Sequence, residues 1–106
     1  MNTKLALFTI PALLFSAGMQ AGQQSGKTIS TVHVNIGSGY YFKTVEPMVD
    51  TENCGNSTWY KLKNSTYTKD AYSLILAAKM SGKKVEFYLK GCSGNYPQVD
   101  WINVYD

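Results

Sequence analysis

Residues 21–28 read AGQQSGKT and match the relaxed phosphate-binding pattern (A or G)-x-x-x-x-G-K-(S or T). A loop of this kind needs a buried strand before the glycines and a helix after the lysine, because backbone N–H groups and the helix N-terminus together hold the phosphates. Here an apolar leader precedes the motif, and residues 28–36 after it alternate like a strand. The match therefore does not predict a nucleotide site.

Catalysis requires a positioned nucleophile or a tuned acid–base pair. The single histidine, His33, lies within a predicted strand and has no neighbouring Asp or Ser motif. Asp50 and Glu52 stand two residues apart in a loop, and a calcium site needs several more oxygen ligands than these two provide. We therefore predict that the protein is not an enzyme.

Aromatic residues are better material for binding, since the chain holds eight Tyr and two Trp. Rings that carry a hydroxyl or an indole N–H suit stacking on sugars or covering a partner surface. We predict that Phe42, Phe87 and Trp101 fill the core. The rings beside Gly-rich or Asn-rich turns are expected to be exposed contacts: Tyr40, Tyr41, Trp59, Tyr60 and Tyr96.

The first 21 residues have the composition of a secretory signal peptide. One charge, Lys4, precedes an uncharged apolar run over residues 5–18, and small residues stand at Ser16, Ala17, Gly18 and Ala21. The run is shorter than the roughly 20 apolar residues that span a bilayer. We expect cleavage between residues 18 and 21, a periplasmic or secreted protein, and no membrane span. An uncleaved N-terminal anchor is the alternative.

Residues 22–106 then form a single domain with two cysteines, Cys54 and Cys92. In an exported protein, a disulfide is the default interpretation of two cysteines. One histidine and no second cysteine pair give no zinc-ligand set. The sequence predicts a Cys54–Cys92 disulfide, no metal and no cofactor.

Alternation of apolar and polar side chains predicts five short strands. The first two are separated by a Gly-Ser-Gly turn, which favours a hairpin. A long loop with Pro, Gly, Asn and Asp residues precedes the third. The five segments are residues 28–36, 40–45, 58–63, 84–90 and 99–105.

A change of period predicts one helix over residues 69–81, with Thr68 as its N-cap and Gly82 as its stop. The element order is then βββ-α-ββ. This is the order of the OB-fold, a small five-stranded barrel that binds oligosaccharides or oligonucleotides. We predict a mainly β OB-fold with one helix, and a simple α+β sheet covered by the helix is the alternative.

The charge of the chain disfavours nucleic acid as a partner. Without Lys4, nine lysines and seven acids remain, so the mature charge is 9 − 7 = +2, and the sequence contains no arginine. Nucleic-acid binding depends on many cations that neutralise phosphates. We predict no nucleic-acid partner.

Several short motifs between Ser25 and about Leu89 resemble one known family. They are SG at 25–26, IS at 29–30, VH at 32–33, YYF at 40–42, a cysteine ahead of the Trp59 strand, and SGKKV at 81–85. Together they resemble the B subunits of subtilase cytotoxin and of the related pertussis-like AB5 toxins. Those subunits carry a cysteine in the second strand where this chain has Phe42, so the disulfide here is expected to be wired differently.

The resemblance implies an OB-fold, export to the periplasm, a homopentameric ring and recognition of sialylated glycans, and it makes a catalytic A subunit a possible partner. It also implies that a serine just before the first strand, Ser25 here, contacts the sugar. We predict a non-catalytic binding subunit whose glycan pockets use Ser25, Tyr40, Tyr41 and Trp59. The alternative is a monomeric periplasmic structural or inhibitor-like protein that binds another protein.

Overall fold

The computed structural model describes residues 22–106, and the expected leader, residues 1–21, lies outside the described residues. Within the described range, five strands and one helix follow in the predicted order βββ-α-ββ. The bounds are β1 (Gln23–Asn35), β2 (Gly39–Thr44), β3 (Tyr60–Leu62), α2 (Thr68–Ser81), β4 (Lys84–Ser93) and β5 (Tyr96–Tyr105). The prediction of a mainly β domain with one helix is confirmed for this part of the chain.

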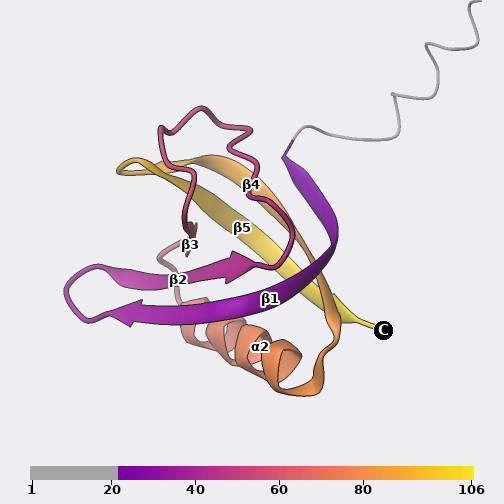
Figure 1. Cartoon of the computed structure of the whole chain (residues 1–106). Helices are drawn as coiled ribbons and strands as arrows, with labels where there is room; N and C mark the ends of the chain where they lie inside the picture. The colour runs from indigo at the N-terminus through magenta and orange to yellow at the C-terminus, as the bar shows by residue number, and fades with distance from the viewer. Residues whose placement is uncertain (1–21) are drawn as a thin grey trace, which may run out of the picture.

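The five strands close into a ring in the order β1-β2-β3-β5-β4 (Figure 1). Neighbouring strands are antiparallel except β3 and β5, which run parallel. β1 is long and takes part in two pairings, with β4 through its first half and with β2 through its second half. One strand therefore links two different outer surfaces of the ring.

Three aromatic side chains from three strands form the centre of the core. Phe42, Tyr60 and Phe87 are each 0% exposed, and their ring centroids lie 4.9 to 5.3 Å apart. The tilted and edge-to-face geometries are those that aromatic rings prefer. The core prediction is confirmed for Phe42 and Phe87. It is wrong for Tyr60, which was expected to be an exposed contact and instead points inward from β3.

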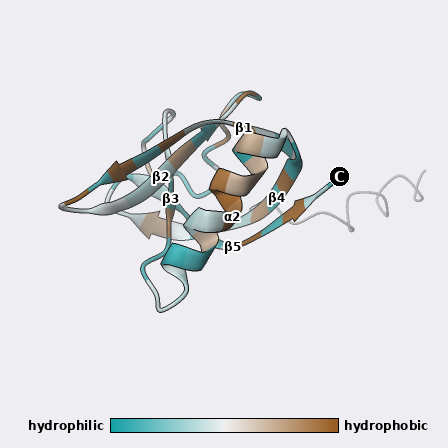
Figure 2. Ribbon diagram, turned by 90° about the horizontal axis from the view of Figure 1, so that it is seen from below, coloured by the Kyte–Doolittle hydropathy of each residue, from teal (hydrophilic) through white to brown (hydrophobic). Residues whose placement is uncertain are grey.

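Helix α2 covers the lower end of the ring in Figure 1, and Figure 2 shows it from below with hydrophobic residues along its middle. Ile75 and Ala78 are the helix residues that enter the core. As predicted, the helix ends at Gly82, whose φ of 72° is left-handed and whose N–H donates to the Ala78 carbonyl. In residues 22–106, no helix combines the length and the apolar character needed to cross a bilayer.

The prediction that Thr68 caps α2 is wrong. Tyr67 occupies the N-cap position without a side-chain cap, and Thr68 is the first helical residue. The Thr68 hydroxyl donates to the Lys63 carbonyl at 2.7 Å and accepts the Ser65 N–H at 2.7 Å. Thr68 thus fastens the turn between β3 and the helix.

β1 begins earlier than predicted, at Gln23. Its pairing with β4 shifts register between Gln24 and Lys27, where Gly26 adopts a φ of 67°. A glycine in the left-handed region at such a shift is typical of a β-bulge. Residues 23–28 of the phosphate-loop match are therefore strand, and this segment does not form a phosphate loop.

The long loop of residues 45–59 is held at its start by Glu46, whose carboxylate accepts the Thr28 N–H of β1 at 2.8 Å. Two further attachments hold it to the ring. The Val49 N–H donates to the Tyr60 hydroxyl at 3.1 Å. The predicted Cys54–Cys92 disulfide is confirmed, with 5.7 Å between the Cα atoms. Beside it, the Glu52 carboxylate accepts the Gly91 N–H at 2.7 Å. β3 is shorter than the predicted strand of residues 58–63, because residues 58, 59 and 63 lie outside it.

Loss of the disulfide should destabilise the domain strongly. The cysteines are separated by 38 residues. Closing a loop of that length stabilises by roughly 4 kcal/mol in the chain-entropy model. We expect the Cys54→Ser/Cys92→Ser variant to lose about 3 to 4 kcal/mol of unfolding free energy in urea denaturation. Reduced wild-type protein should behave like the variant, and unchanged stability on reduction would contradict this assignment.

Candidate functional site

The four residues predicted to bind a glycan lie at three separate places. Tyr41 and Trp59 come together, with ring centroids 6.4 Å apart. Tyr41 is only 6% exposed, so the prediction that it is an exposed contact is wrong: it is covered by the neighbouring rings of Trp59 and Tyr96. Tyr40 points to the opposite face of β2, because successive side chains of a strand alternate. Its ring packs on Tyr72 of α2 at 4.7 Å.

Ser25 lies on the other half of β1. Ser25 precedes His33, the register partner of Tyr41, by eight residues. Eight residues of extended strand span about 26 Å. The Ser25 hydroxyl donates to the Glu86 carboxylate of β4 at 3.4 Å. The structure therefore does not bring Ser25, Tyr40, Tyr41 and Trp59 into one pocket. It shows two distinct outer surfaces.

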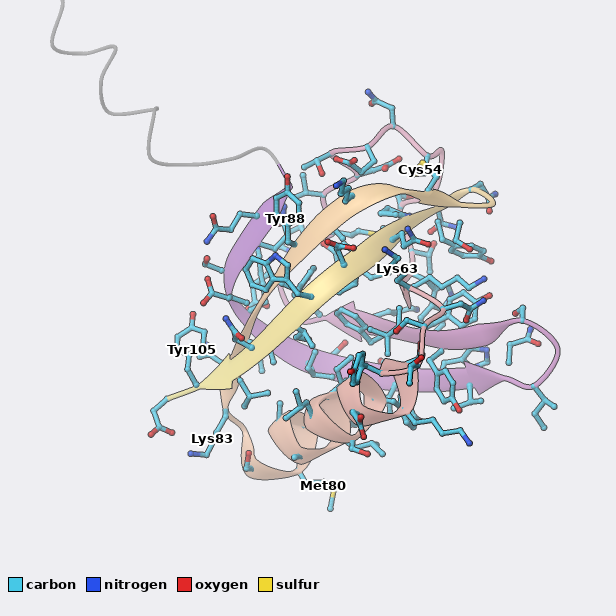
Figure 3. The ribbon with its side chains drawn as sticks, turned by 180° about the vertical axis from the view of Figure 1, so that it is seen from behind. Cys54, Lys63, Met80, Lys83, Tyr88 and Tyr105 are labelled. Atoms are coloured by element: carbon cyan, nitrogen blue, oxygen red, sulfur yellow. A yellow bond between two sulfur atoms is a disulfide. The ribbon has the colours of Figure 1, made fainter. Side chains whose placement is uncertain are left out.

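The first surface covers the outside of β1, β4 and β5. Register pairs join Gln23 to Tyr88, Tyr88 to Trp101, and Glu86 to Asn103. Figure 3 looks at this side of the molecule and places Tyr88 and Tyr105 toward its two ends. We call it the Ser25 surface, defined by Gln23, Ser25, Glu86, Tyr88, Trp101 and Asn103.

A carboxylate stands at the centre of the Ser25 surface. One oxygen of Glu86 accepts from the Gln23 amide at 3.2 Å and from the Ser25 hydroxyl at 3.4 Å. The other oxygen accepts from the Asn103 amide at 3.4 Å. These hydrogen bonds are long, two of them exposed and that from Gln23 partly buried. They gather several donors around one carboxylate, where a polar ligand can compete for them.

An aromatic platform adjoins this polar group. Tyr88 and Trp101 stack with centroids 5.9 Å apart and planes 7° from parallel, and Trp101 is 41% exposed. The prediction that Trp101 fills the core is wrong. A register shift makes Leu89 pair with Val99 and Tyr88 with Trp101, leaving Asp100 as an extra residue. Such a bulge turns the following side chains to the other face.

The second surface lies outside β2 and β3, between the β1–β2 hairpin and the β4–β5 turn, which both extend to the left of β3 in Figure 1. Tyr41 lies 5.0 Å from Tyr96, and His33 lies 5.1 Å from Trp59, between ring centroids. A hollow of 60 Å³ opens among these four rings and Asn35. We call this surface the aromatic–lysine cluster, defined by His33, Tyr41, Lys43, Trp59, Lys61 and Tyr96.

Two ammonium groups stand over rings of the cluster. The Lys43 Nζ lies 4.4 Å from the Trp59 ring centroid, and the Lys61 Nζ lies 5.6 Å from that of Tyr41. Both distances fit cation–π contacts. Sequence reasoning selected the rings but missed the lysines and His33. Strand alternation could have found the lysines, because Tyr41 and Lys43 share a face of one strand.

The loop that carries Trp59 is ordered by side-chain acceptors. The Asn56 side-chain oxygen accepts the N–H groups of Thr58 and Trp59 at 2.7 and 2.9 Å. The Asp50 carboxylate accepts the N–H groups of Cys54 and Gly55 at 2.9 and 2.8 Å. These hydrogen bonds, that from Cys54 above all, lower the pKa of Asp50 below its ordinary value of 3.8.

A third feature is an apolar groove between α2 and β5. It has a volume of 260 Å³ and includes Leu74 and Trp101 in its lining. Tyr67, at its rim, is 71% exposed. Residues 22–106 contain no group of three or more His, Cys, Asp or Glu side chains placed to hold a metal ion.

Comparison of the chain with models of known protein families gives no match, and comparison with curated proteins gives none either. The chemistry of the two surfaces therefore has to be argued from their own residues. Both offer exposed ring faces beside hydrogen-bonding groups, which is the usual composition of a small-molecule or saccharide site.

Asp50 should make the stability of the loop depend on pH. Because folding lowers its pKa, the carboxylate stabilises the protein above pH 3.8, and this contribution is lost as the pH falls through the lower folded-state pKa. We expect Asp50→Ala to lower the unfolding free energy by about 1 kcal/mol at pH 7. The difference from wild type should shrink below about pH 4. Urea denaturation at pH 7 and pH 3 measures it, and a constant difference would contradict this role.

Proposed function

We propose that this protein is an exported, non-catalytic OB-fold domain that binds a saccharide on the Ser25 surface. The observation that carries the proposal is the aromatic platform of Tyr88 and Trp101 beside the polar group centred on Glu86. The resemblance to AB5 toxin B subunits supports the same surface, since it gives Ser25 a role in sugar contact.

The ring topology supports an OB-fold. The strand order β1-β2-β3-β5-β4 closes with β1 shared between β2 and β4, and α2 lies between β3 and β4 in sequence and covers one end. OB-folds are five-stranded, partly open barrels that bind oligosaccharides or oligonucleotides. A disulfide-bonded domain of this kind suits an oxidising compartment, the periplasm or the exterior.

The chemistry of the Ser25 surface suits a sugar. The C–H faces of a pyranose pack on aromatic rings, and Trp101 presents an exposed indole. Sugar hydroxyls both donate and accept hydrogen bonds, and the surface pairs a carboxylate with amide and hydroxyl groups. The Ser25 hydroxyl can donate or accept a hydrogen bond. The same resemblance suggests a sialylated glycan, a homopentameric ring and a catalytic A subunit as partners.

A second candidate function is binding of another protein by a monomer. The apolar groove between α2 and β5 favours it, because Tyr67 and Leu74 are 71% and 43% exposed there. Exposed apolar side chains beside a groove are typical of protein-interaction sites. Trp101 borders both the groove and the Ser25 surface, so variants must separate the two.

A glycan array with the disulfide-intact protein tests the saccharide proposal. We expect sialylated glycans to bind, and Trp101→Ala to weaken binding roughly 10- to 30-fold because it removes the platform. Ser25→Ala should cost about fivefold, as for one hydrogen bond. Tyr67→Ala is the matched control, because it removes an exposed ring from the groove alone, and it should leave binding unchanged.

Two results would reject the proposal. One is the absence of any glycan ligand for correctly folded protein. The other is binding that depends on Tyr67 and not on Ser25, since this would place the ligand in the groove and favour the protein-binding function. Near-ultraviolet circular dichroism of each variant shows that the fold is retained.

The oligomeric state separates the two candidate functions further. If the chain works as the toxin B subunits do, light scattering should give the mass of five protomers at micromolar concentration. A monomer at all concentrations would support the protein-binding alternative. Measurement of the protein denatured in urea serves as the control, because an unfolded chain should not assemble.

A further inference from the structure

We propose that the aromatic–lysine cluster is a second binding site, separate from the Ser25 surface, for a saccharide that carries a sulfate or carboxylate group. The proposal goes beyond sugar binding at Ser25 and does not depend on it. Three observations support the proposal. Within residues 22–106, Lys61 is a buried lysine without an ion pair, aromatic rings surround a hollow beside it, and the chain segments that carry these rings are held in place.

Lys61 is a buried cation without a counterion. It is 8% exposed, and its Nζ stands over the Tyr41 ring at 5.6 Å. The ion pairs within residues 22–106 join Lys63 to Asp100 and Lys83 to Asp106, and no hydrogen bond from the Lys61 ammonium reaches another of these residues. A buried charge is costly unless it is paired. A ligand anion placed beside Lys61 would provide that pairing.

Lys43 adds a second cation on the same surface. Its Nζ lies 4.4 Å from the centroid of Trp59, which itself contacts Tyr41. It too makes no ion pair with a carboxylate in the part of the chain that the structure describes. Two ammonium groups thus border one group of rings that contains no acidic side chain, so the surface attracts anions.

The rings would recognise the sugar itself, whereas the lysines recognise its anionic group. Rings from four chain segments line the hollow of 60 Å³: His33 is exposed, Trp59 and Tyr96 are half-buried, and Tyr41 is buried. Asn35 also lines it, and its side-chain oxygen already accepts the Gly37 N–H at 3.0 Å. The amide NH2 of Asn35 remains to donate to a ligand. Sugar rings suit this combination of apolar faces and a polar donor.

The cluster is held in place before any ligand arrives. Trp59 is the last residue of the loop that the disulfide, Asp50 and Asn56 order. Gly39 makes room for Lys61, because a Cβ at that position would lie 3.1 Å from the lysine Cε. A site whose side chains are fixed in advance loses little entropy on binding.

A saccharide fits this surface better than a nucleic acid does. Polynucleotides are held by many phosphate contacts, and their affinity falls steeply with salt. The cluster offers two lysines, and the full chain has a net charge of +3 with no arginine. One or two anionic groups on a sugar ring match that number of cations.

Isothermal titration of the disulfide-intact protein tests the proposal with five probes of stated chemistry. They are a heparin-derived tetrasaccharide, an oligouronate, a neutral oligosaccharide of equal length, a single-stranded oligonucleotide and sodium sulfate. We expect one or both acidic saccharides to bind, and the neutral saccharide and free sulfate to bind at least about tenfold more weakly, because each has only one part of the required chemistry.

Lys61→Met and Lys43→Met keep much of the aliphatic stem and remove the charge. Each should weaken acidic-saccharide binding about tenfold, the loss expected for one charge-assisted hydrogen bond. Lys63→Met is the matched control. It removes a lysine two residues from Lys61 whose ammonium already pairs with Asp100 at 3.3 Å, and it should bind like wild type. Lys43 is not buried, so that variant keeps the test valid if Lys61→Met misfolds.

Four outcomes would overturn the proposal. They are binding by neither acidic saccharide, equal binding of the neutral one, tighter binding of the oligonucleotide, and sulfate alone binding as well as the sulfated saccharide. Trp101→Ala keeps this proposal distinct from the first one. It should leave acidic-saccharide binding at the cluster intact, and loss of that binding would move the ligand to the Ser25 surface and contradict a second site.

Discussion

The mutual packing of Phe42, Tyr60 and Phe87 is the interaction on which the ring depends. The three rings come from β2, β3 and β4, and each is fully buried. β3 has three residues and pairs through two positions on each side. So short a strand gains little from backbone hydrogen bonds, and burial of Tyr60 and Leu62 must hold it between β2 and β5. Without that burial the ring would open at β3.

The same three residues explain where the outer surfaces lie. Because side chains alternate along a strand, an inward residue places its neighbours outside. The residues flanking Phe42 are Tyr41 and Lys43, and those flanking Tyr60 are Trp59 and Lys61. Glu86 and Tyr88 flank Phe87 in the same way and belong to the Ser25 surface. The inner face of these strand segments thus forms the core, and their outer face carries both candidate sites.

Alternation predicted the strands and the inward positions of Phe42 and Phe87, and the change of period predicted the helix and with it the order βββ-α-ββ. It failed where the backbone departs from a regular strand. The extra residue Asp100 turns Trp101 outward, and the residue types around it give no sequence signal for a bulge. Tyr60 stands next to a loop in sequence, and its burial depends on pairing with β2 and β5, strands that are remote along the chain. The distance between Ser25 and Tyr41 has a similar cause, since β1 pairs with two strands in succession.

The division of β1 between two partners also keeps the two surfaces independent. Its first half shares hydrogen bonds with β4 and its second half with β2, so each surface rests on its own pair of strands. The loop that carries Trp59 is fixed by the disulfide and by Asp50 and Asn56, none of which belongs to the Ser25 surface. The Ser25 surface instead relies on Glu86 and on the Tyr105 hydroxyl, which accepts the Gly26 N–H at 2.8 Å. Substitutions more than about 10 Å apart with no shared partners have additive effects. The two surfaces can therefore change separately, and a scaffold of this size can bear two specificities.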